Sequence, residues 1–136
     1  MARRLEDADY QRLLEFRAGL RRFERWSREQ AAEAGLSPAK HQLLLAIRGH
    51  PDDRGPTITD AAEYLQSQHH SVVELVDRAE KDGLLRRTPD PSDHRVVRLR
   101  LTPTGRRSLE SLAALHLEEL ARLGPQLRRV WQGLGE

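Results

Sequence analysis

Residues 59–102 constrain the fold more than any other part of this sequence. A short helical pattern leads into the polar turn Gln66-Ser67-Gln68, and a longer helical pattern follows and stops at Gly83. Two runs of alternating apolar and polar residues come next, separated by a polar loop. This order predicts a helix-turn-helix followed by a β-hairpin, an arrangement that can place one helix in the major groove of duplex DNA.

The second helix of this unit is expected over residues 68–82, with Ser67 as its N-cap. Its apolar residues follow the spacing i, i+3, i+4, i+7 of one buried face, namely Val72, Leu75, Val76 and Ala79. The opposite face is then exposed, and its N-terminal side chains are the ones that reach base edges when such a helix enters DNA. That face carries His69, His70, Val73, Glu74, Asp77 and Arg78.

Two strands are expected over residues 84–88 and 96–101, where apolar and polar residues alternate. The loop between them, TPDPSDHR, is expected to protrude, and an arginine near its tip can enter the narrow minor groove. Ahead of the helix-turn-helix, Thr57-Ile58-Thr59 is compatible with a short edge strand. Asp60 followed by Glu63 resembles a capping box, which predicts a helix start at Asp60.

Positive charge is concentrated on the hairpin and its flanks. Between residues 84 and 107 the sequence has seven arginines and only two aspartates, whereas the whole chain has a formal net charge of +2. Basic residues gathered in one segment are typical of a surface that binds nucleic acid. Arginines on the strands can hold phosphates and so fix the register on DNA. The arginines of this segment are Arg86, Arg87, Arg95, Arg98, Arg100, Arg106 and Arg107.

The flanking segments predict long helices. Apolar residues at helical intervals indicate one helix over Asp7–Glu33, with Gly35 as its stop. Ser37-Pro38 and Thr102-Pro103 each combine an N-cap residue with proline at the first helical position. Gly124-Pro125 is expected to break the last helix and leave a short final one. A terminal helix of this length is expected to pack against a partner subunit, with packing across its own core as the alternative.

The expected fold class is mainly α with a small β-hairpin (α+β), and the 136 residues are expected to form one domain. Residues 37–102 would be a winged helix-turn-helix core, and residues 1–36 and 103–136 would be dimerisation helices. Such a division predicts a scaffold that pairs two DNA-binding units.

Several classes of function are not expected. The sequence has no cysteine, which excludes disulfides, thiol redox sensing and zinc–thiolate sites. No apolar run approaches the roughly 20 residues of a membrane span, and the N-terminus lacks the apolar core of a secretory signal, so a cytoplasmic protein is expected. Glycine-rich phosphate loops, HExxH and GxSxG are also missing from the sequence, so we expect no catalytic residues, no enzyme activity and no cofactor.

Four short motifs occur in order through the second helix and the hairpin. They are Leu75-Val76-Asp77-Arg78, Gly83-Leu84-Leu85-Arg86-Arg87, Asp90-x-x-Asp93-x-Arg95 and Leu101-Thr102-x-x-Gly105-Arg106. Together they closely resemble the winged-helix core of the MarR (multiple antibiotic resistance regulator) family, over about residues 37–123. The resemblance implies a homodimeric transcription regulator, usually a repressor, that binds pseudo-palindromic operators and is often released by small aromatic or phenolic ligands.

Site residues follow from the exposed face and from the resemblance. DNA contacts are expected from Ser67, Gln68, His69, His70, Ser71, Val73, Glu74 and Arg78 around the second helix, and from Arg87, Asp93, His94 and Arg95 in the hairpin. By position in the family motif, Arg95 is the minor-groove residue. An effector pocket is expected where the long N-terminal helix, the helix after Ser37 and the DNA-binding unit meet, with Trp26, His41 and Tyr64 as candidate lining residues.

Some positions depart from the common family pattern. Ala79 stands where the family usually has leucine, and His94 replaces a common basic residue. Val73 and Glu74 replace a frequent Thr-Arg pair on the DNA-facing side. A carboxylate there is repelled by phosphate but can accept a hydrogen bond from a cytosine amino group. We therefore expect phosphate binding mainly from the hairpin, and sequence preference from the second helix.

Two other functions are compatible with the same residues. A winged helix can bind protein or RNA in place of duplex DNA, and the six histidines leave room for a metal-responsive sensor. His69 and His70 are adjacent, so on a helix they point about 100° apart and cannot easily share one ion. Contacts with bases or phosphates are the favoured role for this pair, and no metal site is expected.

Overall fold

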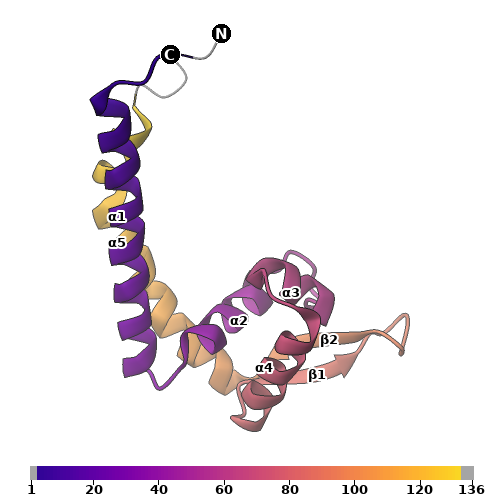
Figure 1. The fold of residues 1–136 in the computed structure, drawn as a ribbon. Coiled ribbons are helices and arrows are strands. Elements are labelled where there is room, and N and C mark those ends of the chain that lie inside the picture. Colours follow the sequence, from indigo (N-terminus) through magenta and orange to yellow (C-terminus); the bar gives the residue numbers. More distant parts are fainter. Residues whose placement is uncertain (1–2, 133–136) are drawn as a thin grey trace.

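The computed structural model describes residues 3–132 and shows a mainly helical protein with a two-stranded antiparallel hairpin (Figure 1). The elements in chain order are α1 (Asp7–Glu33), α2 (Pro38–Gly49), α3 (Ile58–Leu65), α4 (His69–Lys81), β1 (Leu85–Pro89), β2 (Val97–Leu101) and α5 (Pro103–Trp131). This architecture confirms the predicted fold class. The first two and last four residues of the predicted domain lie outside the described residues.

Helix α1 begins and ends where the sequence predicts. At its start, the Asp9 side chain accepts a hydrogen bond from the backbone N–H of Glu6 at 2.8 Å. At its end, Gly35 adopts a φ of +77° that other residues rarely tolerate. The backbone N–H of Leu36 then donates to the Ala31 carbonyl at 2.8 Å, which closes the helix end and buries Leu36. The chain thereby turns directly into α2, whose N-cap Ser37 accepts from the Lys40 N–H.

The helices α2, α3 and α4 and the hairpin form the winged-helix body, residues 38–101. Its core confirms the predicted apolar stripe on α4, because the four stripe residues are buried there. The hairpin contributes Leu85 and Leu99. Leu99 is two residues from Leu101, the residue that pairs with Leu85, so both leucines lie on the same face of the hairpin. The core consists of Leu43, Ile47, Ala61, Val72, Leu75, Val76, Ala79, Leu85 and Leu99.

A second core joins the winged-helix body to the long helices. It consists of Ala31, Leu36, Leu44, Leu84, Leu109 and Leu112. Leu43 and Leu44 are neighbours on α2 but belong to different cores, and the same is true of Leu84 and Leu85. The helix α2 is therefore shared between the two cores and packs against α1 and α5 as well as against the winged-helix body.

The segment before α3 differs from the expectation. Thr57, expected in an edge strand, is the N-cap of α3, and the predicted helix start at Asp60 is wrong. The Thr57 hydroxyl accepts from the Asp60 N–H at 3.1 Å, and the Asp60 carboxylate accepts from the Thr57 N–H at 3.0 Å. This reciprocal pair satisfies two backbone donors at once. Strand pairing is limited to one bond from the Leu99 N–H to the Pro56 carbonyl (2.8 Å), because proline has no N–H with which to continue a ladder.

The turn between α3 and α4 is also shifted by one residue. Gln68, not Ser67, is the N-cap of α4, and the Ser67 hydroxyl donates to the Leu65 carbonyl at 3.2 Å. Gln66 takes up the left-handed conformation with a φ of +50° and ends α3. The Ser67 hydroxyl is already hydrogen-bonded within the turn that follows Gln66, so Ser67 does not cap α4.

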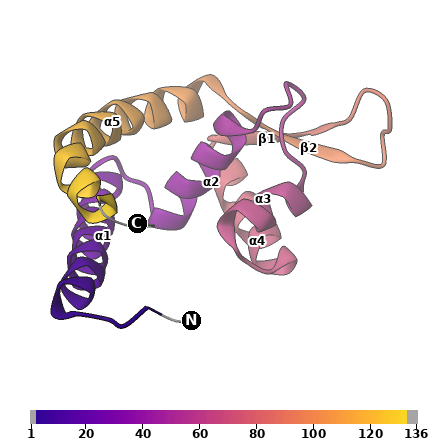
Figure 2. The same ribbon diagram turned by 90° about the horizontal axis from the view of Figure 1, so that it is seen from above.

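The predicted break at Gly124-Pro125 is wrong, because α5 runs without interruption from Pro103 to Trp131 with Pro125 inside it. Proline removes one backbone hydrogen bond and bends a helix rather than always ending it. Figure 2 shows the C-terminal part of α5 turned relative to its first part. Contacts beyond the bend hold it in place, since Val130 is buried and the Trp131 ring packs edge-on against Phe16 with 5.4 Å between ring centroids.

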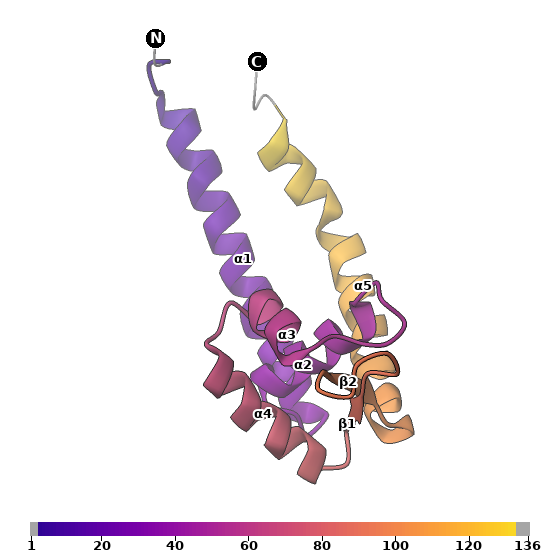
Figure 3. The same ribbon diagram turned by 90° about the vertical axis from the view of Figure 1, so that its right-hand side faces the viewer.

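The helix α1 and the C-terminal half of α5 leave the winged-helix body together as a two-helix arm (Figures 1 and 3). Figure 3 shows the two helices running alongside each other away from the body. Within residues 3–132, none of the helices combines the length and the apolar character needed to cross a membrane.

Candidate nucleic-acid interface and open cavity

The N-terminal half of α4 offers a row of polar side chains to solvent. Residues 66–71 are exposed without interruption, and Glu74, Asp77 and Arg78 continue the exposed face. Val73 is half-buried at the edge of this face. The structure thus brings the predicted set on this helix together on one surface, namely Ser67, Gln68, His69, His70, Ser71, Val73, Glu74 and Arg78.

The hairpin projects beyond the helices as a wing (Figure 1). Asp90 organises its loop from a nearly buried position, with a side chain that is 3% exposed. One carboxylate oxygen accepts from the backbone N–H groups of Ser92 (2.8 Å) and Asp93 (3.1 Å), and the other accepts from Arg98 Nε at 2.8 Å. The hydrogen bond from Ser92, assisted by Arg98, holds the pKa of Asp90 below its ordinary value. The loop therefore has a defined shape even though it protrudes.

Arg95 lies near the tip of the wing. Among the hairpin arginines that form ion pairs, it has the most exposed side chain. Its side chain is 90% exposed, and Nε donates to the Asp93 carboxylate at 3.0 Å. This contact lowers the pKa of Asp93, so the carboxylate stays charged and orients the guanidinium. His94 is exposed beside them. The predicted wing residues Asp93, His94 and Arg95 thus form one continuous tip.

Arg87 is not placed as a free phosphate ligand. Its guanidinium pairs with Asp77 and with Glu80 of α4, the latter at 2.6 Å, and its backbone N–H donates to Glu80 at 3.0 Å. Arg98 is similarly occupied by Asp90 and has a side chain that is 13% exposed. These two arginines brace the wing against its neighbours. Sequence reasoning missed this role because the acidic partners on α4 come into reach only after folding.

The three predicted effector residues do not lie together. Tyr64 lies on α3, where its hydroxyl contacts His50 Nδ1 at 2.8 Å, and it does not line the cavity that contains His41. Trp26 and His41 both pack against His116. Their ring centroids lie 4.8 Å and 4.9 Å, respectively, from that of His116. Tyr64 is therefore separated from the other two.

His41 instead lines a cavity of about 880 Å³ between α1, α2 and α5. The lining residues are Phe23, Glu24, Ser27, Arg28, Pro38, His41, Gln42, Leu45, Leu109, Ala113, His116, Leu117 and Leu120. Seven of these thirteen residues are apolar, and of the polar ones Ser27 contacts His116. Burial, together with the nearby His116, lowers the pKa of His41, so its ring is neutral near pH 7.

His116 has defined hydrogen bonds at the wall of this cavity. Its Nδ1 lies 2.7 Å from the Leu112 carbonyl, which can only accept, so Nδ1 carries the proton. Its Nε2 lies 2.6 Å from the Ser27 hydroxyl and accepts from it when the ring is neutral. Sequence reasoning left Ser27 and His116 out of the site. The available signal was spacing, because His116 follows Leu109 and Leu112 by seven and four residues on the same helical face.

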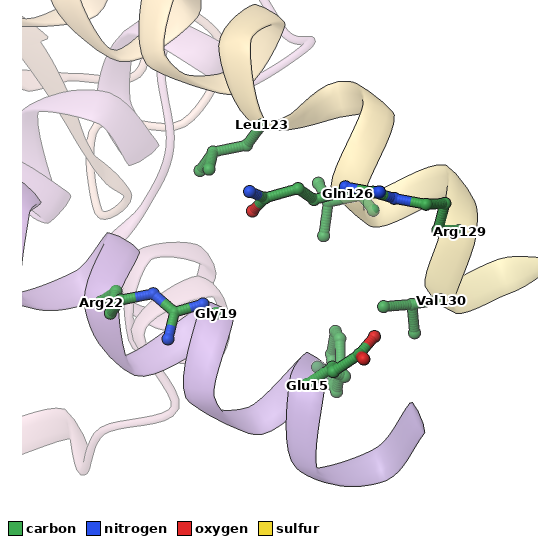
Figure 4. A pocket seen from close by; sticks show the side chains of 9 residues that line it. Glu15, Gly19, Arg22, Leu123, Gln126, Arg129 and Val130 are labelled. Atoms are coloured by element: carbon green, nitrogen blue, oxygen red, sulfur yellow. The ribbon is translucent and has the colours of Figure 1, made fainter. Parts of the chain in front are cut away.

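A second cavity of about 340 Å³ opens between the two helices of the arm (Figure 4). Side chains from both helices line it, with Glu15 and Arg22 on α1 and Gln126 and Arg129 on α5 as the polar ones. The arm also exposes many large apolar side chains: Tyr10, Leu13, Leu14, Leu20, Leu115, Leu117, Leu120, Leu127 and Trp131. So many exposed apolar residues on two neighbouring helices are typical of a surface covered by another chain.

Among residues 3–132, no group of three His, Asp or Glu side chains lies within reach of one metal ion. His69 and His70 are both exposed at the start of α4.

Comparison with known proteins gives one family. A family model described as "MarR family" matches residues 34–96. The HTH-type transcriptional regulator YsmB of Bacillus subtilis is 38% identical over 50 residues, which are 37% of this chain and 34% of YsmB. The HTH-type transcriptional repressor MdtR of the same organism is 28% identical over 86 residues, which are 63% of this chain and 54% of MdtR. The matches thus span about a third of the length of YsmB and about half of the length of MdtR.

The fold is similar to that of solved regulators. The Staphylococcus aureus MepR–DNA complex has a TM-score of 0.68 at 23% sequence identity, and the match covers 82% of this chain and 80% of MepR. MepR is described as a transcription regulator of a multidrug efflux pump. At this identity the comparison shows a shared fold, including the helix-turn-helix and the wing.

Proposed function

We propose that the protein is a sequence-specific transcription regulator of the MarR type that binds duplex DNA as a homodimer, in line with the family model that matches residues 34–96 and with the similarity to MdtR. The α4 helix would enter the major groove, and Arg95 would enter the adjacent minor groove. The observation that carries this proposal is the geometry of the wing. Asp90 and Arg98 fix its base, and Asp93 orients a 90% exposed Arg95 at its tip.

The two-helix arm supports the homodimer. Leu13 and Leu14 are 62% and 66% exposed in the single chain, and Leu117 is 67% exposed. Leaving such side chains in water is unfavourable, and each leucine contributes about 1.5–3 kcal/mol when it is fully buried. A second copy has the same apolar face and can cover it symmetrically. Two α4 helices paired in this way would read half-sites about 34 Å apart.

The cavity at His41 and His116 supports a ligand-responsive repressor. Its volume of about 880 Å³ falls in the range of small-molecule sites, and its apolar walls with a few hydrogen-bonding groups suit a small aromatic effector. The cavity lies between the helices that join the arm to the winged-helix body. An effector that binds better to one arrangement of these parts would shift the protein toward it and change the spacing of the α4 helices. Repression is supported by the likeness to MdtR, a repressor.

A salt titration tests DNA binding. Fluorescence anisotropy with labelled duplex DNA should show an affinity that falls steeply as salt rises, because phosphate contacts release counterions. Arg95→Ala should weaken binding and reduce the salt slope by about one. Arg122→Ala is the matched control, since Arg122 is also exposed and paired with a neighbouring acid, Glu119, but lies on the arm. Equal or tighter binding to single-stranded RNA, or no duplex binding at modest salt, would contradict the proposal.

Tryptophan fluorescence tests the effector site. Trp26 packs against His116 at the cavity, so Trp131→Phe leaves one tryptophan as a local reporter. Titration with small aromatic acids and phenols should quench this signal and raise the thermal midpoint. Ala113→Phe should fill part of the cavity without adding a second tryptophan, and it should abolish the response while DNA binding persists. A response that survives this substitution would place the ligand elsewhere.

A further inference from the structure

We infer that Glu74 selects cytosine in the major groove and so determines the operator sequence of this protein. This inference rests on the proposed function, because it assigns a base to one residue of the α4 helix. Glu74 lies in the second turn of α4 and is exposed. It follows His70 by four residues and precedes Arg78 by four, so the three side chains form one row along the helix.

The carboxylates of α4 divide into two groups. Asp77 and Glu80 are both paired with Arg87 of β1, which neutralises them and holds them toward the hairpin. Among the described residues, no hydrogen bond or ion pair within 4.0 Å engages the Glu74 side chain. Glu74 is therefore the α4 carboxylate whose acceptor oxygens remain available to a ligand.

The position and the charge of the Glu74 carboxylate together restrict which groups of DNA it can bind. Residues 66–71, before Glu74, are exposed and contain neither lysine nor arginine, so no fixed positive charge there offsets the carboxylate. The next cation on the same row is Arg78, one turn further from the N-terminus of α4. A helix that enters the groove by its N-terminal half would bring Glu74 to the base edges, where a bare carboxylate is tolerated only beside a donor.

The base edges supply such a donor selectively. An ionised carboxylate only accepts hydrogen bonds, so it is repelled by guanine N7 and O6 and by thymine O4. Cytosine presents its N4 amino group in the major groove. Adenine also presents an amino group, but its N7 acceptor lies beside it and disfavours a negative charge. Cytosine is thus the base that satisfies Glu74.

Selection from a random duplex pool tests the inference with the full-length protein. The wild type should enrich one cytosine per half-site with at least about 10-fold discrimination against the other bases. Glu74→Gln should change the preference at this position to adenine, since a glutamine amide can bond N6 and N7 together. Glu74→Ala should lose the preference at this position and keep the rest of the site. Glu110→Gln, an exposed acid on α5, is the matched control and should leave the motif unchanged.

Other outcomes would overturn the inference. One is a motif that is identical in the wild type and in both Glu74 variants. Another is tighter binding by both variants to every sequence without a change of motif, which would mean that Glu74 merely repels phosphate. Thermal midpoints close to that of the wild type would show that both variants are folded. A wild type that enriches no duplex motif would contradict the proposed function itself and the role of Glu74 with it.

Discussion

Arg98 Nε donates to the Asp90 carboxylate at 2.8 Å, and this pair closes the base of the wing. The two side chains are 13% and 3% exposed, so water competes little for the contact. Arg54, in the loop between α2 and α3, approaches the same carboxylate oxygen at 3.3 Å. Asp90 therefore connects β2, the wing loop and the body of the protein at one point.

Replacing Asp90 with asparagine should loosen the wing. The amide carries no negative charge, so it leaves Arg98 without its anionic partner at a site largely shielded from water. We expect a lower thermal midpoint at pH 7, faster protease cleavage in residues 89–97 and weaker DNA binding. Asp53→Asn, at an exposed aspartate of the neighbouring loop, is the control and should change none of these.

The same substitution has a defined pH dependence. The pKa of Asp90 lies below its ordinary value of 3.8 in the folded protein, because Ser92 and Arg98 favour the charged form. The contact therefore contributes its full stability above about pH 3.8 and loses it as the pH falls through the folded pKa. The difference in thermal midpoint between the wild type and Asp90→Asn should shrink with acidification. A difference that stays constant down to the acid limit would contradict an ionic role.

Gly105→Ala should strongly destabilise the protein. A Cβ at this position would lie 2.0 Å from the carbonyl oxygen of Leu84, which also accepts from the Thr102 N–H. Backbone atoms would have to move apart, at a cost of about 3 kcal/mol or more in the free energy of unfolding. Gly49→Ala, with no heavy atom within 4 Å of the new Cβ, should change stability by less than about 1 kcal/mol. Chemical denaturation of both variants measures the contrast.

Stability should decrease as the pH falls below 6.5, the ordinary pKa of histidine, because of His41. Burial lowers the folded pKa of His41, so the unfolded chain takes up the proton first and gains stability relative to the fold. Above pH 6.5 both states are neutral and the effect vanishes. His41→Leu should flatten this part of the pH profile, whereas His69→Gln, at an exposed histidine, should leave it unchanged. Denaturation midpoints measured across this pH range provide the test.

Charges on the exposed face of α1 should separate the subunits. Leu13→Glu together with Leu14→Glu would place two carboxylates where the partner's apolar side chains are proposed to pack, and burying them unpaired is costly. Sedimentation velocity should show the double variant as a monomer under conditions where the wild type is a dimer. Val97→Glu, at a 38% exposed position on the wing, should remain dimeric. A double variant with wild-type mass would place the dimer interface elsewhere.

Local patterns predicted most of the fold. The spacing of Val72, Leu75 and Val76 predicts the buried face of α4, and Ser37-Pro38 predicts the start of α2. The errors lie where two local signals compete. Thr57 and Asp60 both suit a helix start, and only the reciprocal hydrogen bonds of the folded chain select Thr57. Pro125 favours a helix end, but packing of Val130 and Trp131 beyond it keeps α5 continuous.

The candidate sites were harder to predict from the sequence than the fold. The exposed side of α4 follows directly from its buried stripe, so its surface residues could be predicted. The cavity could not, because Ser27, His41 and His116 come from three helices that are distant in the chain. The pairing of Arg87 with Asp77 and Glu80 depends in the same way on how β1 packs beside α4. The sequence predicts a basic segment, and only the fold shows which of its arginines are already paired with carboxylates of the same chain.

The symmetry of the DNA that this protein selects tests its central claim most directly. Full-length protein should be incubated with a random pool of duplexes at moderate salt, and the bound molecules should be sequenced. A homodimer that reads DNA with two α4 helices should enrich a two-fold symmetric motif with half-sites about one helical turn apart. No enriched duplex, or a single half-site without symmetry, would contradict the proposed dimeric DNA-binding regulator.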